Sequence, residues 1–322
     1  MKNEFNFIKS KLKPLSFNNK EARGLSDDCA TFNNLNNLVI SVDTSVEGVH
    51  VPIGTDIAIQ SRRAILRALS DLATFGSSPI CVFAAMTLPK SFQESDFDRI
   101  AEGYRKALIE YDIFLAGGDI TSHDGLPIFS ITVLGDNGNE KLGRNKARDG
   151  DLIVVSGSIG DSFVGLNLLI DDDLKQNSLV GNNLVNKFLI PNPQIELGKN
   201  IKMFATSIID ISDGLISEIK HLCENSKVGA DINIIDIPIS TEAKKYIDSN
   251  IFNHIDLITG GDDYELLYTI DPKDEKLIDA NSFIIGKIIS GNKINLYSKD
   301  KNLIDVNKII LGYKHFYRKK FN

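Results

Sequence analysis

The sequence predicts an α/β (α+β) protein of two domains, in which helices pack against sheets. Strand-length apolar segments alternate with amphipathic helices in both halves of the chain. The 322 residues are also enough to bury two cores. Residues 136–150, which separate the halves, are rich in Gly and Asn and almost free of apolar side chains. We therefore place one domain at 1–137 and the other at 138–322.

The first half is predicted to form a sheet with helices packed on it. Residues 38–46 are rich in β-branched residues and alternate in polarity, which predicts a strand. After Thr55 the apolar residues recur at helical spacing, and Gly76 is a plausible signal for the end of that helix. The remaining elements of this half are a strand, a helix and two further strands, at residues 79–88, 95–111, 113–118 and 126–135.

The second half repeats units of a strand followed by a helix or a turn. The polar segment 171–183 is expected to be a loop between two of these units. The expected strand-bearing segments are residues 151–157, 206–214, 230–238, 264–270 and 282–288, and the expected helices include residues 215–223 and 241–247.

Charge and composition exclude several classes of function. Lys and Arg number 36 against 43 Asp and Glu, a net charge of −7, which argues against a general nucleic-acid binder. No apolar run reaches 18 residues, and the first residues lack the apolar core of a secretory signal. Three cysteines without a CxxC spacing indicate neither a disulfide framework nor a zinc site. We expect a cytoplasmic protein that contacts neither nucleic acid nor membrane.

Aspartates recur where predicted strands end, which is where α/β proteins collect ligand-binding side chains. Each of them taken singly is explained by turn or helix-capping chemistry. Asp71 differs, because it lies in an apolar helical pattern where a carboxylate is costly unless it is paired or metal-bound. Carboxylates gathered by the fold would suit Mg²⁺. The aspartates in question are Asp27, Asp28, Asp43, Asp119, Asp210, Asp213, Asp262 and Asp263.

Signals for phosphate binding are present, although there is no GxxxxGK[ST] motif. Residues 156–165 form a strand–Gly-turn–helix pattern whose N–H groups could cradle a phosphate, but a tight turn before an ordinary helix is the commoner explanation. The GGD sequence at 117–119 permits close approach of the backbone to a ligand. No Ser/His/Asp or Cys/His arrangement indicates covalent catalysis.

Eight segments in order resemble the thiamine-monophosphate kinases, a family of the aminoimidazole-ribonucleotide-synthetase-like superfamily. The resemblance covers residues 24–316 and implies a homodimer that uses ATP and several Mg²⁺ ions to convert thiamine monophosphate into thiamine diphosphate. The segments are GLSDDCA, VISVDTSVEGVH, RALSDLATFG, LAGGDITS, ARDGDLIVVSGSIGDSFVGL, IDISDGLISEIKHLC, GGDDYELL and GYKHF.

The resemblance also implies roles for individual residues. Asp71, Asp119 and Arg144 would be catalytic. ATP would contact Tyr104, Gly118, Asp119, Arg144 and Ser212, and the thiamine phosphate would contact His50, Asp262 and Tyr313. Metal would bind Asp28, Ser41, Val42, Asp43, Asp71, Asp119, Asp210 and Asp213.

The chain departs from the family pattern at three of these segments. Ser26 replaces the usual Gly, Val42 replaces a Thr beside the metal, and Asp262 replaces a longer Glu. Two alternatives stay open at this point. One is another ATP-dependent synthetase of the same superfamily, and the other is a module that binds nucleotide or metal without catalysis.

Overall fold

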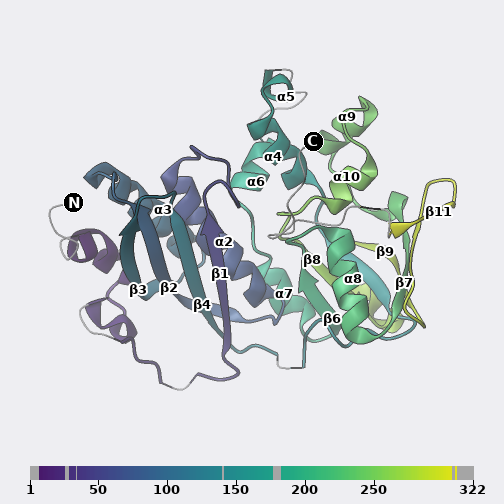
Figure 1. Cartoon of the computed structure of the whole chain (residues 1–322). Coiled ribbons are helices and arrows are strands. Elements are labelled where there is room, and N and C mark those ends of the chain that lie inside the picture. Colours follow the sequence, from purple (N-terminus) through teal and green to yellow (C-terminus); the bar gives the residue numbers. More distant parts are fainter. Residues whose placement is uncertain are drawn as a thin grey trace. The chain divides into compact units, whose positions relative to one another are not determined.

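The computed structural model describes residues 7–25, 29–33, 35–139, 141–176, 183–306 and 309. The chain divides into two compact units (Figure 1). Unit 1 combines residues 1–141 with 189–202, and unit 2 combines residues 142–188 with 203–322. The single boundary predicted at 137/138 therefore missed the return of 189–202 to unit 1.

Helix α7 (Ile195–Ile201) accounts for that return, because it packs on helix α2 (Ile57–Ala73). A Cβ at Gly198 would lie only 2.2 Å from the carbonyl oxygen of Ala73, so the two helices touch backbone to backbone. The signal for this contact is one small residue on a short helix. Sequence periodicity does not report such a contact, because it comes from an element more than a hundred residues away.

Unit 1 is built on a four-stranded sheet with the order β1-β4-β2-β3. Strands β2 and β3 are parallel, and the other neighbours are antiparallel. Helix α2 contacts β1 and β4, and helix α3 (Glu94–Glu110) packs on α2. All the elements predicted for this half are confirmed. The strands are β1 (Val39–Val46), β2 (Ser78–Pro89), β3 (Phe114–His123) and β4 (Ile128–Asp136), preceded by the short helices η1 (Ile8–Leu12), η2 (Lys13–Ser16) and η3 (Lys20–Leu25).

Local sequence determines where α2 begins and ends. The Asp56 side chain accepts a hydrogen bond of 2.8 Å from the N–H of Ala58, which caps the first turn. The helix ends at Ala73 with Thr74 as its C-cap, so the signal at Gly76 lies two residues too far along the chain; Gly76 itself has a φ of +56°, which favours glycine. A Cβ at Gly103 would lie 2.2 Å from the carbonyl oxygen of Ala58, so α3 also approaches α2 closely.

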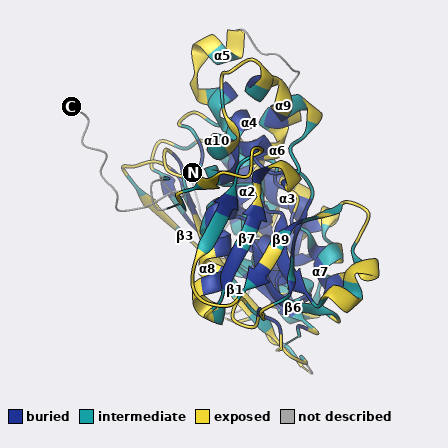
Figure 2. Ribbon diagram, turned by 90° about the vertical axis from the view of Figure 1, so that its right-hand side faces the viewer, coloured by how far each residue is buried: buried dark blue, intermediate teal, exposed yellow. Residues whose placement is uncertain are grey.

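Unit 2 is built on a seven-stranded mixed sheet with the order β11-β10-β7-β9-β5-β8-β6. Figure 2 shows strands β6 and β7 largely buried, whereas β9 is mostly half-buried. The strands are β5 (Leu152–Ser156), β6 (Ala205–Asp210), β7 (Gly229–Asn233), β8 (Leu266–Ile270), β9 (Ser282–Ile289), β10 (Ile294–Tyr297) and β11 (Leu303–Ile304). The α-helices are α4 (Asp161–Ile170), α5 (Asp172–Gln176), α6 (Asn183–Leu189), α8 (Leu215–Ser226), α9 (Thr241–Asp248) and α10 (His254–Thr259), and the 3₁₀ helices are η4 (Ile234–Asp236) and η5 (Pro272–Leu277).

Two hydrophobic clusters hold this unit together. One joins α8 to the sheet, with Ile216 and Ile219 packed among strand residues that include Ile232. The other joins α4, α6, α9 and α10 around Val164 and Tyr246. No described helix is both long enough and apolar enough to cross a bilayer.

The loop predicted at 171–183 is wrong in its first part, where residues 172–176 form helix α5. The Asp171 side chain accepts hydrogen bonds of 3.0 Å from the N–H groups of Asp173 and Leu174 and so starts a helical turn. Residues 177–182 lie outside the described part of the chain.

Candidate functional site

The facing sides of β1 and α2 gather three of the predicted metal ligands in unit 1. Side chains alternate along β1, so Ser41 and Asp43 lie on the side of the strand that faces α2. The Ser41 hydroxyl donates a hydrogen bond to Oδ2 of Asp71 on α2. Asp43 lies 3.3 Å from Nη2 of Arg67, which is one helical turn before Asp71. Two carboxylates and one hydroxyl thus form a set of hard oxygen donors, which suits Mg²⁺.

Val42 lies on the other face of the sheet, and its side chain cannot join this set. The residue is 62% exposed, on the side away from Ser41 and Asp43. As a predicted ligand it has only its main-chain carbonyl oxygen to offer. The replacement of Thr by Val therefore leaves the facing side of β1 and α2 unchanged.

Asp119 is not brought to Asp43 and Asp71 within this chain. Through the sheet register, Asp43 is in line with Ile131, Ala84 and Gly118, so Asp119 falls in the next row and points to the opposite face. Strands β1 and β3 are also the two edges of the sheet, which separates their backbones by about 14 Å. The prediction that these aspartates converge is not met inside one copy of unit 1.

A cavity of about 550 Å³ lies beside Asp119. Gly117, Gly118 and Asp119 form part of its wall, and most of the other lining side chains are apolar, including Leu12 and Phe83. In the described part of its lining, the pocket therefore offers apolar walls and one carboxylate. Such a lining suits an uncharged planar group better than a polyphosphate.

The expectation that Tyr104 contacts ATP is wrong in this structure. Tyr104 is fully buried, its ring packs edge-on against Phe129 at 6.2 Å between centroids, and burial raises the pKa of its hydroxyl. The helical spacing that placed Tyr104 on the apolar side of α3 also predicts this core position. A nucleotide cannot reach it there.

His50 has a defined tautomer. Its Nδ1 accepts a hydrogen bond of 3.0 Å from the N–H of Val46, so in the neutral ring the proton is on Nε2. The surrounding loop is held by Glu47, whose buried carboxylate accepts a 2.6 Å hydrogen bond from the N–H of Gly54. Nε2 is therefore a hydrogen-bond donor, which suits an anionic group such as a phosphate.

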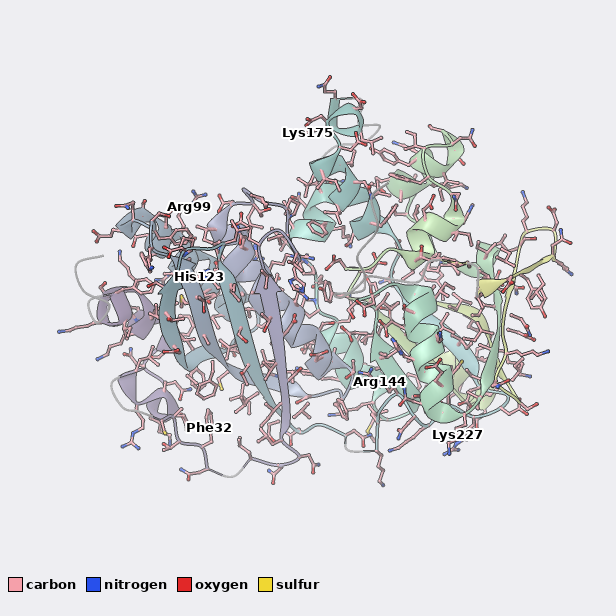
Figure 3. All side chains as sticks on the ribbon, viewed as in Figure 1. Phe32, Arg99, His123, Arg144, Lys175 and Lys227 are labelled. Atoms are coloured by element: carbon pink, nitrogen blue, oxygen red, sulfur yellow. The ribbon has the colours of Figure 1, made fainter. Side chains whose placement is uncertain are left out.

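In unit 2, carboxylates gather where β6 leads into α8. Asp210 ends β6 and is buried, and the N–H of Asp213 donates to Oε1 of Glu218 at 3.3 Å. Burial, together with the negative charges of Asp210 and Asp213, raises the pKa of Glu218 to about 8. The positive charge of Arg144 (labelled in Figure 3) lowers the pKa of Glu218 and so opposes this shift. A cation is therefore favoured at this turn.

Asp262 is held against the same turn by a main-chain hydrogen bond, and a second hydrogen bond orients its side chain. Its N–H donates to the carbonyl oxygen of Ser212 at 2.8 Å, and the Tyr264 hydroxyl donates to Oδ1 of Asp262 at 2.9 Å. A Cβ at Gly261 would lie 2.3 Å from the same Ser212 oxygen, so only glycine fits there. Of the predicted site residues, Ser212, Asp213 and Asp262 are thus brought together.

The phosphate cradle considered for residues 156–165 is excluded, because an internal carboxylate already occupies it. Oδ2 of Asp263 accepts a 2.9 Å hydrogen bond from the N–H of Gly160, and Oδ1 accepts a longer one, 3.5 Å, from Ser162. A phosphate would have to displace Asp263. The tight turn before an ordinary helix is therefore the correct interpretation.

Glu265 supplies a test of how this carboxylate-rich region is stabilised. Burial raises its pKa, although the Ser156 hydroxyl donates to its Oε2 and opposes the shift. A raised acid pKa contributes stability below the unfolded value, near 4.5, and that stability is lost as pH rises through the folded pKa. Glu265→Gln, which keeps an acceptor for Ser156, should therefore unfold at a higher temperature than wild type. The difference should widen from pH 5 to pH 8 in thermal melts, and a constant difference would contradict this account.

Two predicted residues, Asp28 and Tyr313, lie outside the described part of the chain. Among the described residues, no three His, Cys, Asp or Glu side chains are arranged so that they alone could hold a metal ion. Mg²⁺ commonly takes one or two carboxylates and completes its shell with water and phosphate, so the pair at Asp43 and Asp71 still fits it.

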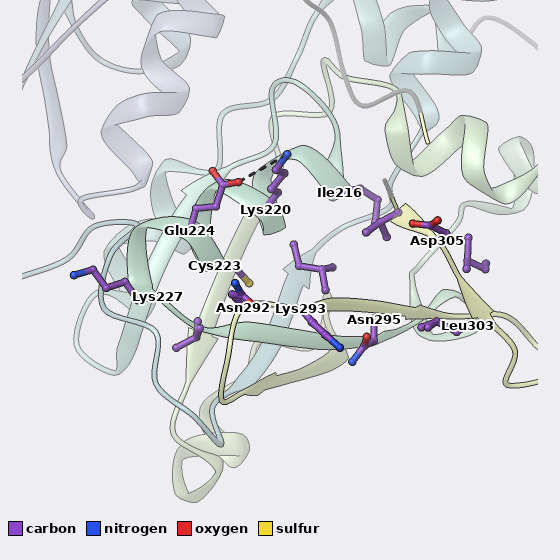
Figure 4. A pocket seen from close by; sticks show the side chains of 14 residues that line it. Ile216, Lys220, Cys223, Glu224, Lys227, Asn292, Lys293, Asn295, Leu303 and Asp305 are labelled. Carbon is purple, nitrogen blue, oxygen red and sulfur yellow. Dashed lines mark ion pairs between the residues drawn. The ribbon is translucent and has the colours of Figure 1, made fainter. Parts of the chain in front are cut away.

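A pocket of about 920 Å³ on unit 2 contains none of the predicted site residues among its described lining (Figure 4). It lies along α8, β10 and β11, and its charges are mixed. Lys220 lies 3.8 Å from Glu224, and Asp305 is also in the lining. We do not assign the substrates to it.

The sequence analysis missed Arg67 and Glu218. Both lie on helices that were predicted correctly, and Glu218 is a charged residue within an otherwise apolar helical face. That is the signal that singled out Asp71, and it applies equally to Glu218 beside Ile219 and Leu222.

Comparison with known proteins identifies the family. The chain matches the models of AIR synthase related protein, N-terminal domain, over residues 26–136, and AIR synthase related protein, C-terminal domain, over residues 148–299. It is 36% identical over 287 residues to the thiamine-monophosphate kinase of Buchnera aphidicola subsp. Schizaphis graminum, with 86% of each chain covered. The chain belongs to the thiamine-monophosphate kinases.

Solved structures agree with this membership of the thiamine-monophosphate kinases. A thiamine-monophosphate kinase from Stenotrophomonas maltophilia K279a superposes with a TM-score of 0.80 at 27% identity, covering 90% of this chain and 95% of that one. AaThiL complexed with AMPPCP and TMP superposes with a TM-score of 0.76 at 28% identity, covering 87% of both chains. The two-domain α/β architecture and the thiamine-phosphate kinase class predicted from the sequence are confirmed.

Proposed function

We propose that this kinase transfers the γ-phosphoryl group of ATP to thiamine monophosphate, giving ADP and thiamine diphosphate, with the help of Mg²⁺. The observation that carries the proposal is the gathering of Ser41, Asp43 and Asp71 on facing elements, in a family whose AaThiL member was solved with AMPPCP and TMP. AMPPCP is an ATP analogue with a methylene bridge. It supports ATP as the phosphoryl donor here.

Each unit would offer oxygen donors of its own to metal. In unit 1 these are Ser41, Asp43 and Asp71, and in unit 2 they are Asp210 and Asp213. Bound Mg²⁺ would neutralise phosphate charge on both reactants, which otherwise repel each other. Burial is the main cause of the raised pKa of Glu218, and the negative charges of Asp210 and Asp213 add to it; a cation at this turn would relieve that repulsion.

The side chains then act by binding and orientation. Nε2 of His50 would donate to the thiamine phosphate, Arg144 would contact the ATP phosphates, and Asp262 would lie toward the thiamine. In line with the γ-phosphorus, a thiamine phosphate oxygen forms the new P–O bond as the bond to ADP breaks. That oxygen is already deprotonated near neutral pH, since the second pKa of such monoesters is about 6. The chain therefore needs neither a nucleophile nor a general base.

We also propose the expected homodimer, formed through the outer face of the unit 1 sheet. Ile40 and Val42 are 55% and 62% exposed on this face, which is unusual for apolar side chains on a strand. Asp119 projects from the same face. A second copy packed there would cover the apolar side chains, and Asp119 would then lie at the interface with the partner subunit. The expected cytoplasmic location stays a prediction.

The test is ADP release by the purified protein with ATP and Mg²⁺, measured with and without thiamine monophosphate. The proposal expects ADP only when thiamine monophosphate is present, in equal amount to the thiamine diphosphate formed, and none when EDTA removes the metal. ATP binding without ADP release in either case would favour a non-catalytic binding module. ADP release that requires a different acceptor would favour another synthetase of the superfamily.

A further inference from the structure

Helix α2 and strand β1 run antiparallel with steps of nearly equal length. Ser41 contacts Asp71, and two residues further along the strand Asp43 contacts Arg67, four residues back along the helix. Two strand residues advance about 6.7 Å and four helical residues about 6 Å. Because these two distances nearly match, Asp71 lies opposite Ser41 and Arg67 lies opposite Asp43.

One nitrogen of Arg67 faces both oxygens of the Asp43 carboxylate. Nη2 lies 3.3 Å from Oδ2 and 3.5 Å from Oδ1. The Arg67 side chain is only 11% exposed, against 27% for Asp43, so the guanidinium approaches from the helix side with little water around it. Partial burial strengthens the attraction relative to a surface ion pair.

We propose that Arg67 is a built-in counter-ion which holds Asp43 in the metal-free enzyme and competes with the divalent cation for that carboxylate. The inference rests on the proposed metal role of Asp43 and Asp71. Arg67 and a divalent cation need the same two oxygens and repel each other, so Arg67 lowers the affinity of the site for metal alone. It is a positioning residue, because it acts through Asp43.

The chemistry of the cluster explains why such a residue is useful. Asp43 and Asp71 are like charges on facing elements, and their repulsion would oppose the packing of α2 on β1. A positive charge on the helix relieves that repulsion before metal binds. Arg67 thus holds the two carboxylates close together before metal binds, and it weakens the binding of the metal itself.

The experiment measures Mn²⁺ binding to the full chain without nucleotide, from the electron paramagnetic resonance signal of the free ion. Arg67→Gln is expected to bind Mn²⁺ about tenfold more tightly than wild type. Arg67→Lys keeps the charge on a shorter and more strongly hydrated side chain, so its Mn²⁺ affinity should fall between those of wild type and Arg67→Gln. The matched control is Arg62→Gln on the same helix, whose partner is Glu110 at 2.6 Å, and its Mn²⁺ affinity should equal wild type.

Equal or weaker Mn²⁺ binding by Arg67→Gln overturns the inference. If that variant does not fold, Arg67→Lys decides, and an affinity at or below that of wild type overturns the inference as well. The proposed function can fail separately. A wild-type protein that releases ADP with thiamine monophosphate, paired with an Arg67→Gln variant of unchanged affinity, refutes only the role of Arg67. A wild-type protein that neither binds Mn²⁺ nor releases ADP refutes both.

Discussion

Asp71→Asn is expected to lower turnover by at least about a thousandfold while the protein stays folded. The substitution removes the charge of a proposed metal ligand, and the stabilisation that such a metal gives to a phosphoryl-transfer transition state is several kcal/mol. The fold should survive, because the amide oxygen of Asn can still accept the hydrogen bond from Ser41. The measurement is kcat from ADP release, with thermal unfolding recorded on the same preparation.

Asp124→Asn is the matched control for this variant. Asp124 belongs to the same unit, its side chain is 81% exposed, and its partner is Lys90 at 2.9 Å. Exposed pairs of this kind contribute at most about 1 kcal/mol, so this variant should keep normal turnover and stability. Near-normal turnover in Asp71→Asn would remove the role assigned to that residue.

Gly214→Ala should cost about 3–5 kcal/mol of unfolding free energy, and Gly150→Ala only about 1–2 kcal/mol. Both glycines have a positive φ, +105° at Gly214 and +96° at Gly150. They differ in the room available for an added Cβ atom. A Cβ at Gly214 would lie 2.6 Å from the carbonyl oxygen of Thr259, whereas one at Gly150 would have nothing within 4 Å. The difference between the two variants therefore isolates the close packing of the turn that follows Asp213.

Urea unfolding of both variants measures these costs. Gly214→Ala should also lower turnover, because relief of the clash moves Asp213 or the segment leading to Asp262. Equal destabilisation by the two substitutions would show that the backbone conformation alone sets the cost. It would also mean that the turn can shift without losing stability.

The elements of the fold were largely predictable, because each leaves a local periodicity in the sequence. The strand at 39–46 and the helix at 57–73 follow from alternation, helical spacing and the residues that cap them. The return of 189–202 to unit 1 was not predictable in this way, since it depends on a contact between distant elements. Local patterns carry no information about such contacts.

The features of the candidate site also divide into those that follow from a local pattern and those that depend on contacts between distant segments. That Ser41 and Asp43 share a face follows from strand alternation, and Asp71 stood out as a carboxylate in an apolar helix. The position of Asp119 on the opposite face required the order and register of the sheet, which no segment encodes alone. Capture of the Gly160 N–H by Asp263 likewise joins residues about a hundred positions apart.

The hydrogen bonds that join residues 211–212 to 262–265 bear on the order of events during folding. Ile211 and Ser212 bond to a segment fifty residues later in the chain, and that contact closes a long loop. Closing a loop of that length costs conformational entropy before the contact is gained, which slows folding. During synthesis, Asp210 and Asp213 emerge well before Asp262, so the proposed thiamine side of the site is completed only after the larger part of unit 2 has been made. A chain that stops before residue 260 would carry most of the proposed metal ligands and lack the segment that aligns Asp262.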